Sequence, residues 1–171
     1  LHEDGVIDEK DRTFLGNPAP KFTFGFNNYF AYKGFDLNIF LNGSVGNKAV
    51  NLIRRTFTDP MRNSNLLKEA TDIALIGMHD PEVGDEELSN VYIVNADRAK
   101  VQRVTTSSAN DNNRISSRFI EDASYLRIKN ISLGYTFPRK WLRHLQIDNI
   151  RLYVNIQNLC TISGYKGYDP E

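Results

Sequence analysis

Hydrophobic and polar residues alternate in four stretches of this 171-residue chain, which is the pattern of half-buried β-strands. The stretches cover residues 21–31, 35–46, 126–137 and 151–159. In the first, Phe22, Phe24, Phe26 and Phe30 share one parity, while small and polar residues take the other. A short turn at residues 32–34, in which Gly34 can adopt a positive φ, joins the first two stretches. The pattern therefore predicts a β-hairpin with one strongly apolar face.

The region between the second and third stretches, Asn47 to Ser117, shows no good strand pair. Its apolar spacing predicts a short helical turn over residues 50–57 and a second helix over 66–74 that ends at Gly77. A connection of this length is unusual in a compact soluble domain. It is ordinary on a membrane β-barrel, whose long loops alternate with short turns. A β-sandwich in water shows the same alternation within its strands, so both architectures stay open on this pattern alone.

The apolar parity changes inside the third stretch, near Asn130. Leu126 and Ile128 are even-numbered, whereas Ile131 and Leu133 are odd-numbered. A β-bulge would produce such a change. A strand that continues above the membrane and packs against other structure there would also produce it.

The connection over residues 138–149 contains Trp141 and Leu145, which we expect either to form a small apolar anchor or, for Trp141, to join an interfacial aromatic girdle. Four strands are too few to close a barrel, for which about eight is the smallest number. The open edges of the predicted sheet must therefore pair with other strands.

Composition excludes several classes of function. The 21 basic and 21 acidic residues balance and form no basic stripe, so no nucleic-acid partner is predicted. Cys160 is the single cysteine, which excludes an internal disulfide. No phosphate-binding glycine loop, no G-x-S-x-G nucleophile motif and no pair of carboxylates on a rigid element occurs, so the chain is not expected to be an enzyme.

Several segments resemble, in order, the SusC/RagA family of TonB-dependent outer-membrane transporters. They are residues 4–13 (DGVIDEKDRT), 15–21 (LGNPAPK), 32–37 (YKGFDL), 119–135 (FIEDASYLRIKNISLGY), 157–159 (QNL) and 165–171 (YKGYDPE). Each motif is weak alone, and the order of all of them is what carries the resemblance. The match leaves out roughly residues 58–116.

The resemblance implies an all-β fold in which residues 1–171 supply late antiparallel strands of a plugged transmembrane barrel of about 22 strands. The region 47–117 would be a long extracellular loop with short helices. The plug domain would precede residue 1, and closing strands would follow residue 171. The implied function is import of oligosaccharides or peptides across the Gram-negative outer membrane. A SusD-like surface lipoprotein and the TonB–ExbB–ExbD complex, the latter bound through the preceding part, would be partners beside membrane lipid.

Two other functions remain as alternatives. The first is a soluble β-rich carbohydrate-binding module. The second is a TonB-dependent receptor for siderophores or cobalamin, against which the YKGFDL and GYDPE motifs argue by resemblance.

The acidic segment at the start of the chain resembles the second half of a calcium loop. Asp4, Asp8 and Asp11, with the Val6 carbonyl, would supply the hard oxygen ligands that Ca²⁺ prefers, and Gly5 would allow a sharp turn. A solvated acidic turn is the alternative. No other metal or cofactor is predicted.

Candidate substrate contacts lie on the polar parity of the strands, which would face the barrel lumen. They are Tyr29, Phe40, Tyr153 and Asn155. Aromatic rings and amides suit stacking on sugars and hydrogen bonding to them, and the same side chains could instead pack on the plug domain.

Overall fold

The computed structural model describes residues 8–85, 87–104 and 111–170. The chain divides into two compact units. We call Leu1–Leu15 with Val50–Ile120 the loop unit, and Gly16–Ala49 with Glu121–Glu171 the sheet unit. Each is described by itself.

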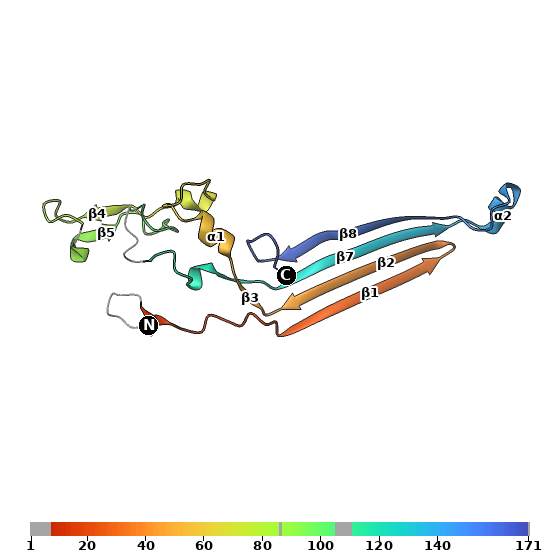
Figure 1. Cartoon of the computed structure of the whole chain (residues 1–171), viewed down its shortest axis with the longest axis horizontal. Helices are drawn as coiled ribbons and strands as arrows, with labels where there is room; N and C mark the ends of the chain where they lie inside the picture. The colour runs from red at the N-terminus through yellow and green to blue at the C-terminus, as the bar shows by residue number, and fades with distance from the viewer. Residues whose placement is uncertain (1–7, 86, 105–110, 171) are drawn as a thin grey trace. The chain divides into compact units, whose positions relative to one another are not determined.

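Four long strands form the sheet unit (Figure 1). They are β1 (Phe22–Tyr32), β2 (Phe35–Val45), β7 (Tyr125–Thr136) and β8 (Arg151–Ser163), in the order β1-β2-β7-β8 with every neighbouring pair antiparallel. Their lengths of 11 to 13 residues suffice for a tilted strand to cross a bilayer. The fourth strand continues four residues beyond its predicted end, and the others lie within one residue of prediction.

The turn between β1 and β2 consists of Lys33 and Gly34, which both have positive φ, at 45° and 90°. Two-residue hairpins favour this conformation because its twist matches that of the strands. A Cβ on Gly34 would lie 2.7 Å from the Thr136 carbonyl oxygen. Glycine is therefore required there by packing against β7 as well as by φ.

A bulge at Lys129 explains the change of apolar parity in β7. Phe40 lies opposite Asn130, but Leu41 lies opposite Ile128, so Lys129 is an extra residue relative to β2. Toward β8 the register also shifts between Ile128 and Asn130, where Asn158 has a φ of 50°. Of the two explanations left open by the sequence, the bulge is the one that the structure contains.

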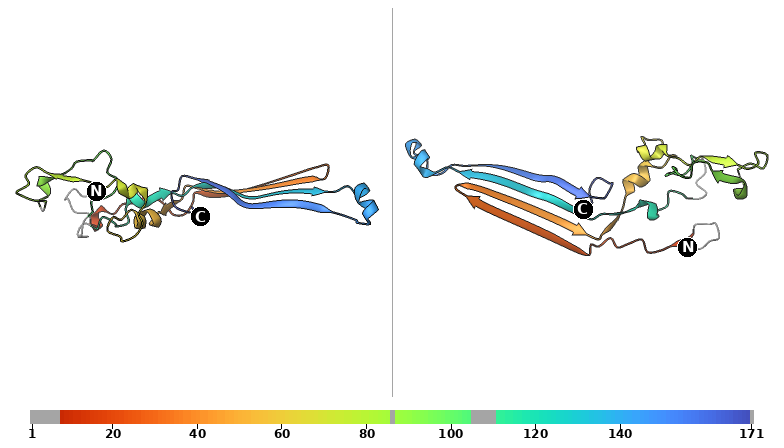
Figure 2. Two further views of the ribbon diagram at one scale, coloured as in Figure 1. Left: turned by 90° about the horizontal axis from the view of Figure 1, so that it is seen from above. Right: turned by 180° about the vertical axis from the view of Figure 1, so that it is seen from behind.

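The bulge keeps the two faces of the sheet chemically distinct along its length. One face, called the apolar face, carries Phe22, Phe24, Phe26, Phe30, Tyr32, Phe35, Leu37, Ile39, Leu41, Val45, Leu126, Ile128, Ile131, Leu133, Tyr135, Leu152, Val154, Ile156, Cys160 and Ile162, with Asn28 as the one polar amide among them. The other is called the polar face. Viewed edge-on, the sheet is a single layer (Figure 2). Many side chains of the apolar face are consequently exposed, including Leu152 at 67% and Leu133 at 49%.

The connection between β7 and β8 contains α2 (Arg139–Leu142) and the 3₁₀ turn η5 (Arg143–Leu145). Leu142 is 4% exposed, whereas Trp141 is 58% exposed. The expected apolar anchor is therefore wrong in detail, because Leu142 rather than Trp141 or Leu145 is the buried residue. Trp141 lies 6.4 Å from Phe137, ring centre to ring centre, which keeps it beside the strand end.

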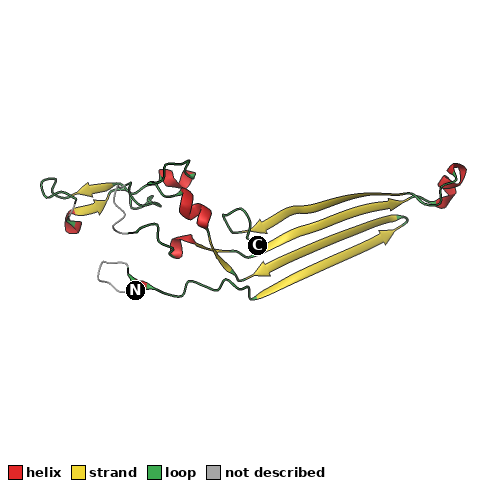
Figure 3. Ribbon diagram, in the orientation of Figure 1, coloured by secondary structure: helices red, strands yellow, loops and turns green. Residues whose placement is uncertain are grey.

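Short elements make up the loop unit (Figure 3). They are η1 (Glu9–Asp11), α1 (Leu52–Phe57), η2 (Lys68–Thr71), β4 (Ile76–Met78), η3 (Leu88–Asn90), β5 (Val91–Ile93) and η4 (Ser117–Phe119). Two further short strands, β3 (Lys48–Val50) and β6 (Ile120–Asp122), pair with each other. No helix among the described residues is long and apolar enough to span a membrane.

Two expectations for this region are wrong. The helix predicted over residues 66–74 is only the 3₁₀ turn η2, and Gly77 lies in β4 opposite Tyr92 instead of ending a helix. The region also does contain a strand pair, β4 with β5. The predicted turn over 50–57 is present as α1, which Asn51 caps by accepting a hydrogen bond from the Arg54 N–H at 2.9 Å.

Candidate functional site

The predicted lumen contacts all lie on the polar face, but they do not form one cluster. Tyr29 lies opposite Asn38, Asn38 opposite Ser132, and Ser132 opposite Asn155, so a single row crosses all four strands. Tyr29 and Asn155 stand at the two ends of this row, three strand spacings or about 14 Å apart. They therefore cannot contact the same sugar ring.

Phe40 and Tyr153 lie on either side of that row. The Phe40 ring leans over Gly25, where an added Cβ would be 3.4 Å from the ring. Tyr153 lies opposite Gly134, and its ring centre is 5.4 Å from the Arg151 guanidinium carbon. Tyr29, at 65% exposed, and Tyr153, at 61%, present most of their surface outward from this sheet.

An ion pair that sequence reasoning missed crosses the polar face near the β1–β2 turn. Arg151 of β8 donates to the Asp36 carboxylate of β2 through Nη2 at 2.5 Å and through Nε at 3.2 Å. The pair passes over β7 at Gly134, where an added Cβ would lie 2.6 Å from Asp36 and 2.7 Å from Arg151. The opposite charges of Asp36 in β2 and Arg151 in β8, with Gly134 between them in β7, become a recognisable pair only when the strand order is known.

Three asparagines on the polar face carry buried acceptors without donors. The Oδ1 atoms of Asn38, Asn42 and Asn130 are buried and receive no hydrogen bond from the described part of the chain. A buried unpaired polar group costs about 1–3 kcal/mol. These oxygens are covered by the sheet unit itself and therefore count against its stability.

A second ion pair links two of the sequence motifs. Arg127 of β7 is 6% exposed and donates through Nη2 to Asp169 of the GYDPE segment at 2.5 Å and through Nε to Thr161 at 2.9 Å. Its guanidinium carbon also lies 5.2 Å from the centre of the Tyr125 ring. The backbone N–H of Lys166 donates to Glu121 at 3.0 Å. The segment after β8 is thus held against the sheet unit by polar contacts.

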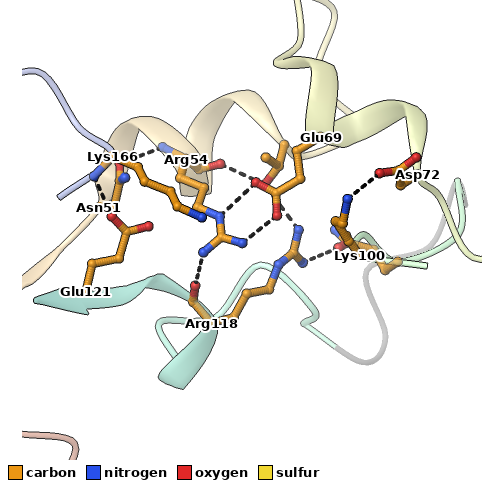
Figure 4. A network of polar contacts seen from close by, with 10 residues as sticks. Asn51, Arg54, Glu69, Asp72, Lys100, Arg118, Glu121 and Lys166 are labelled. Atoms are coloured by element: carbon orange, nitrogen blue, oxygen red, sulfur yellow. Dashed lines mark hydrogen bonds and ion pairs between the residues drawn. The ribbon is translucent and has the colours of Figure 1, made fainter. Parts of the chain in front are cut away.

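The loop unit is organised around a polar network (Figure 4). Arg54 of α1 donates to both Glu69 carboxylate oxygens, at 2.9 and 2.5 Å, and to the carbonyl of Arg118 at 2.9 Å. Arg118 in turn donates to Gln102 at 2.7 Å and to Thr58 at 3.2 Å. Burial lowers the pKa of the Arg118 guanidinium, which still keeps its charge at neutral pH. The network joins segments far apart in sequence around α1.

The β4–β5 hairpin of the loop unit is closed by two asparagine side chains. Asn90, which is buried, donates through Nδ2 to the carbonyls of Asp80 and Gly84, and it accepts from the Asp80 N–H. Asn95 donates to the Ile73 carbonyl and accepts from the Leu75 N–H. Several large apolar side chains of this hairpin remain exposed in the loop unit: Leu75, Ile76, Met78, Tyr92, Ile93 and Val94.

The acidic segment forms a small capped turn. The Asp8 carboxylate accepts from the Lys10 N–H at 2.7 Å, and the Asp11 carboxylate accepts from the Asp8 N–H at 3.1 Å. Asp4 lies outside the described residues. Within those residues, no three His, Cys, Asp or Glu side chains gather as a metal-binding group. Calcium binding stays a prediction.

The sequence is similar to those of TonB-dependent receptors. No model of a protein family matches the sequence. The chain is 34% identical over its whole length to TonB-dependent receptor P3 of Formosa agariphila, of which it covers 15%. It is 27% identical, over 98% of its length, to TonB-dependent receptor SusC of Bacteroides thetaiotaomicron, of which it covers 14%.

The fold has counterparts among solved structures. The RagAB peptide importer in its "closed-closed" state superposes with a TM-score of 0.62 at 25% identity, over 89% of this chain and 15% of that one. The "open-open" state gives the same TM-score at 24% identity. The chain spans about 15% of the length of the first relatives that it matches. The antiparallel β fold predicted from the alternation is confirmed.

Proposed function

The chain belongs to the SusC/RagA family of TonB-dependent receptors, and from this premise we propose that it forms wall strands and one large loop of an outer-membrane nutrient importer. The apolar face of the sheet would contact lipid, and the polar face would look into the barrel. RagAB is a peptide importer, and we extend nutrient import to the receptor that contains this chain, with oligosaccharides or peptides as substrates.

The single observation that carries this proposal is the continuous apolar face. Its side chains come from all four strands, and the bulge at Lys129 keeps it unbroken where the sequence parity changes. Water-soluble proteins rarely expose contiguous apolar surface beyond a few hundred Å². A soluble sandwich would cover such a face with a second sheet, whereas the four long strands of the sheet unit form one sheet. Lipid is the surrounding that stabilises this face without a second layer.

The polar face supports a barrel interior filled with polar groups. Asn38, Asn130, Asn155 and the Asp36–Arg151 ion pair all lie on this face. The exposed rings of Tyr29 and Tyr153 are available for packing or stacking on the same face. We favour packing on a plug domain over stacking on a substrate for these two rings.

The loop unit would lie on the extracellular side, where barrel loops are long. We propose that it contacts a SusD-like lipoprotein through the β4–β5 hairpin. The exposed apolar side chains of that hairpin and the rigid closure of its tip by Asn90 support this assignment. Energy would come from the TonB complex through a part of the receptor outside this chain. Siderophore or cobalamin uptake is the less favoured alternative, because SusC is among the relatives.

Replacing the hairpin tests the proposal. In the full-length receptor, residues 76–93 would be exchanged for a short Gly-Ser linker, which leaves Asn95 and the Arg54 network in place. We expect normal amounts of receptor in the outer membrane, with at least a tenfold loss of lipoprotein co-purification because the central apolar contacts of an interface carry most of its free energy.

The control is Lys33→Asn, which makes the turn Asn-Gly and preserves its type at the other end of the strands. This control should retain both co-purification and uptake of labelled oligosaccharide or peptide. Unchanged co-purification and unchanged uptake in the hairpin variant would rule out the hairpin as the partner contact.

A further inference from the structure

Aromatic side chains gather at the turn end of the sheet unit, where β1 meets β2 and β7 leads into α2. Tyr32 lies opposite Phe35, and Phe35 lies opposite Tyr135, so an aromatic row crosses three strands. The row continues by ring contacts: the centres of Phe35 and Tyr135 are 4.4 Å apart, and those of Tyr135 and Phe137 are 5.0 Å apart. Trp141, 6.4 Å from Phe137, completes it. Such a row on the apolar side is typical of the boundary between hydrocarbon and headgroups.

Immediately beyond this aromatic row stand four exposed cations, Lys33, Arg139, Lys140 and Arg143. None of them forms an ion pair with a described residue. Asp36 is neutralised by Arg151, so Asp148 is the one unpaired acid among the described residues of this end. Four positive charges less one negative charge leave a local charge of +3, although the whole chain is neutral.

The geometry of Lys33 connects the cations to the aromatic row. Its Nζ atom lies 5.1 Å from the centre of the Tyr32 ring, so the charged group of this exposed lysine stands beside the aromatic row. Lysine and arginine at the edge of an apolar surface can keep their charged groups among lipid headgroups. Arg139 and Lys140 directly precede Trp141 in α2, so these two cations also adjoin an aromatic residue along the chain.

We propose that this end of the sheet unit binds the phosphodiester headgroups of anionic phospholipids, with Lys33, Arg139 and Lys140 as the main contacts and Arg143 as an outer one. The inference rests on the proposed function. Because the β1–β2 connection has two residues and barrels place short turns on the periplasmic side, the lipid would come from the periplasmic leaflet. The guanidinium of Arg139 can donate two hydrogen bonds to one phosphate, and the two ammonium groups add point charges.

The proposal is tested on the full-length receptor in nanodiscs made from equal parts of phosphatidylcholine and phosphatidylglycerol. Native mass spectrometry counts the phospholipids that stay bound after the nanodisc is removed in the gas phase. In the variant Lys33→Gln/Arg139→Gln/Lys140→Gln, we expect retained phosphatidylglycerol to fall about tenfold or more, since each cation near a membrane surface attracts anionic lipid appreciably. Retained phosphatidylcholine should change little.

Two controls separate charge at this position from charge in general. Lys10→Gln/Lys21→Gln/Arg62→Gln removes three exposed cations elsewhere, which likewise lack an ion pair to a described residue, and should leave lipid retention unchanged. Lys33→Arg/Arg139→Lys/Lys140→Arg keeps the charge and should keep most of the phosphatidylglycerol. Equal losses in both glutamine variants, or no preference of the wild type for phosphatidylglycerol, would overturn the proposal.

Other outcomes also decide the matter. Release of the retained lipid by millimolar inorganic phosphate would assign the site to free phosphate instead of a membrane. Unchanged lipid retention together with loss of a co-purifying acidic protein would assign it to a protein partner. A receptor that never enters a bilayer would instead contradict the proposed function, so the two failures are distinguishable.

Discussion

The sheet unit and the loop unit are stabilised in opposite ways. In the sheet unit, continuous backbone ladders join four strands, while many large apolar side chains stay exposed on one face. In the loop unit, regular elements are three to six residues long, and side chains such as Arg54, Asn90 and Asn95 satisfy backbone groups directly. The buried apolar residues of the loop unit are few: Ala70, Val101 and Phe119.

The two units should therefore be sensitive to different kinds of substitution. A strand position in the sheet unit tolerates most side chains that suit its face, because backbone hydrogen bonds supply the pairing, but Gly43 and Gly134 leave no room for a Cβ. The loop unit depends on individual partners, because an ion pair or amide that loses one member leaves the other buried and unpaired. Substitutions should therefore be sorted by face in the sheet unit and by partner in the loop unit.

The largest effect should come from a charge on the apolar face. We expect Ile131→Arg, at the middle of β7 on the apolar face, to destabilise the folded full-length receptor by about 2–4 kcal/mol, the cost of an arginine at the lipid face near the bilayer centre. Urea unfolding in lipid vesicles measures it. The adjacent variant Ser132→Arg, on the polar face, is the matched control and should cost clearly less. If both variants cost the same, the two faces do not meet different surroundings.

An intermediate effect is expected from the Arg54–Glu69 pair in the loop unit. Both side chains are about one-fifth exposed, at 21% and 20%, so the pair is only weakly screened by water. Glu69→Gln should destabilise the loop unit locally by about 1–3 kcal/mol. The substitution removes the negative charge to which Arg54 donates through Nε and Nη2. Amide hydrogen exchange across α1 should accelerate, whereas exchange in the four long strands should not.

The control for that experiment is Asp72→Asn, which removes the exposed ion pair to Lys100 in the same unit. Lys100 holds the pKa of the Asp72 carboxyl below its usual value by a hydrogen bond and by its charge, but the pair faces water. Exposed pairs contribute little, so exchange across α1 should stay within error. If amide exchange across α1 is as slow in Glu69→Gln as in the wild type, the network does not stabilise the helix.

The smallest effect concerns pH and Asp122, in β6. Hydrogen bonds from Ser124, together with a hydrogen bond and charge from Lys48, lower the pKa of this carboxyl to about 2. A carboxyl whose pKa is depressed by folding stabilises the folded state above its unfolded pKa, near 4, and loses that contribution as pH falls toward 2. Because the group is largely exposed, the effect should be under about 1 kcal/mol.

The variant Asp122→Asn measures this contribution. The difference in unfolding free energy between wild type and variant should be constant from neutral pH to about 5 and should shrink between about 4 and 2. Proteolysis of the segment around β6 at each pH provides a local readout. A difference that grows on acidification would mean that the carboxyl acts through some other contact.

The sequence predicted the four long strands of the sheet but only some features of the candidate site. Alternation predicted the four long strands because a half-buried strand imposes a period of two on its residues, whatever its partners are. It placed Tyr29, Phe40, Tyr153 and Asn155 on the polar side for the same reason. It could not predict the Asp36–Arg151 pair, which joins residues 115 positions apart, because strand order decides that contact.

The loop unit was harder to predict. The apolar spacing over residues 66–74 suits a helix, yet only the turn η2 forms there. After η2 the Ala74 N–H donates to the Val101 carbonyl, and the Asn95 side chain donates to the Ile73 carbonyl. Those tertiary contacts replace the backbone hydrogen bonds that a helix would have made, so local propensity was overridden. The polar network around Arg54 left no periodic signal at all.

By itself the sequence determined which residues of each long strand share a face, where the hairpin turns, and that the parity changes near Asn130. These follow from local geometry, since a pleated strand alternates its side chains and a two-residue turn needs positive φ. Only the tertiary structure decided that a bulge at Lys129 keeps the apolar face continuous, and that Asp36, Arg127 and Glu69 have the partners they have. Such pairings depend on which segments, distant in sequence, become neighbours in space. The alternation of hydrophobic and polar residues along one segment does not determine its neighbours.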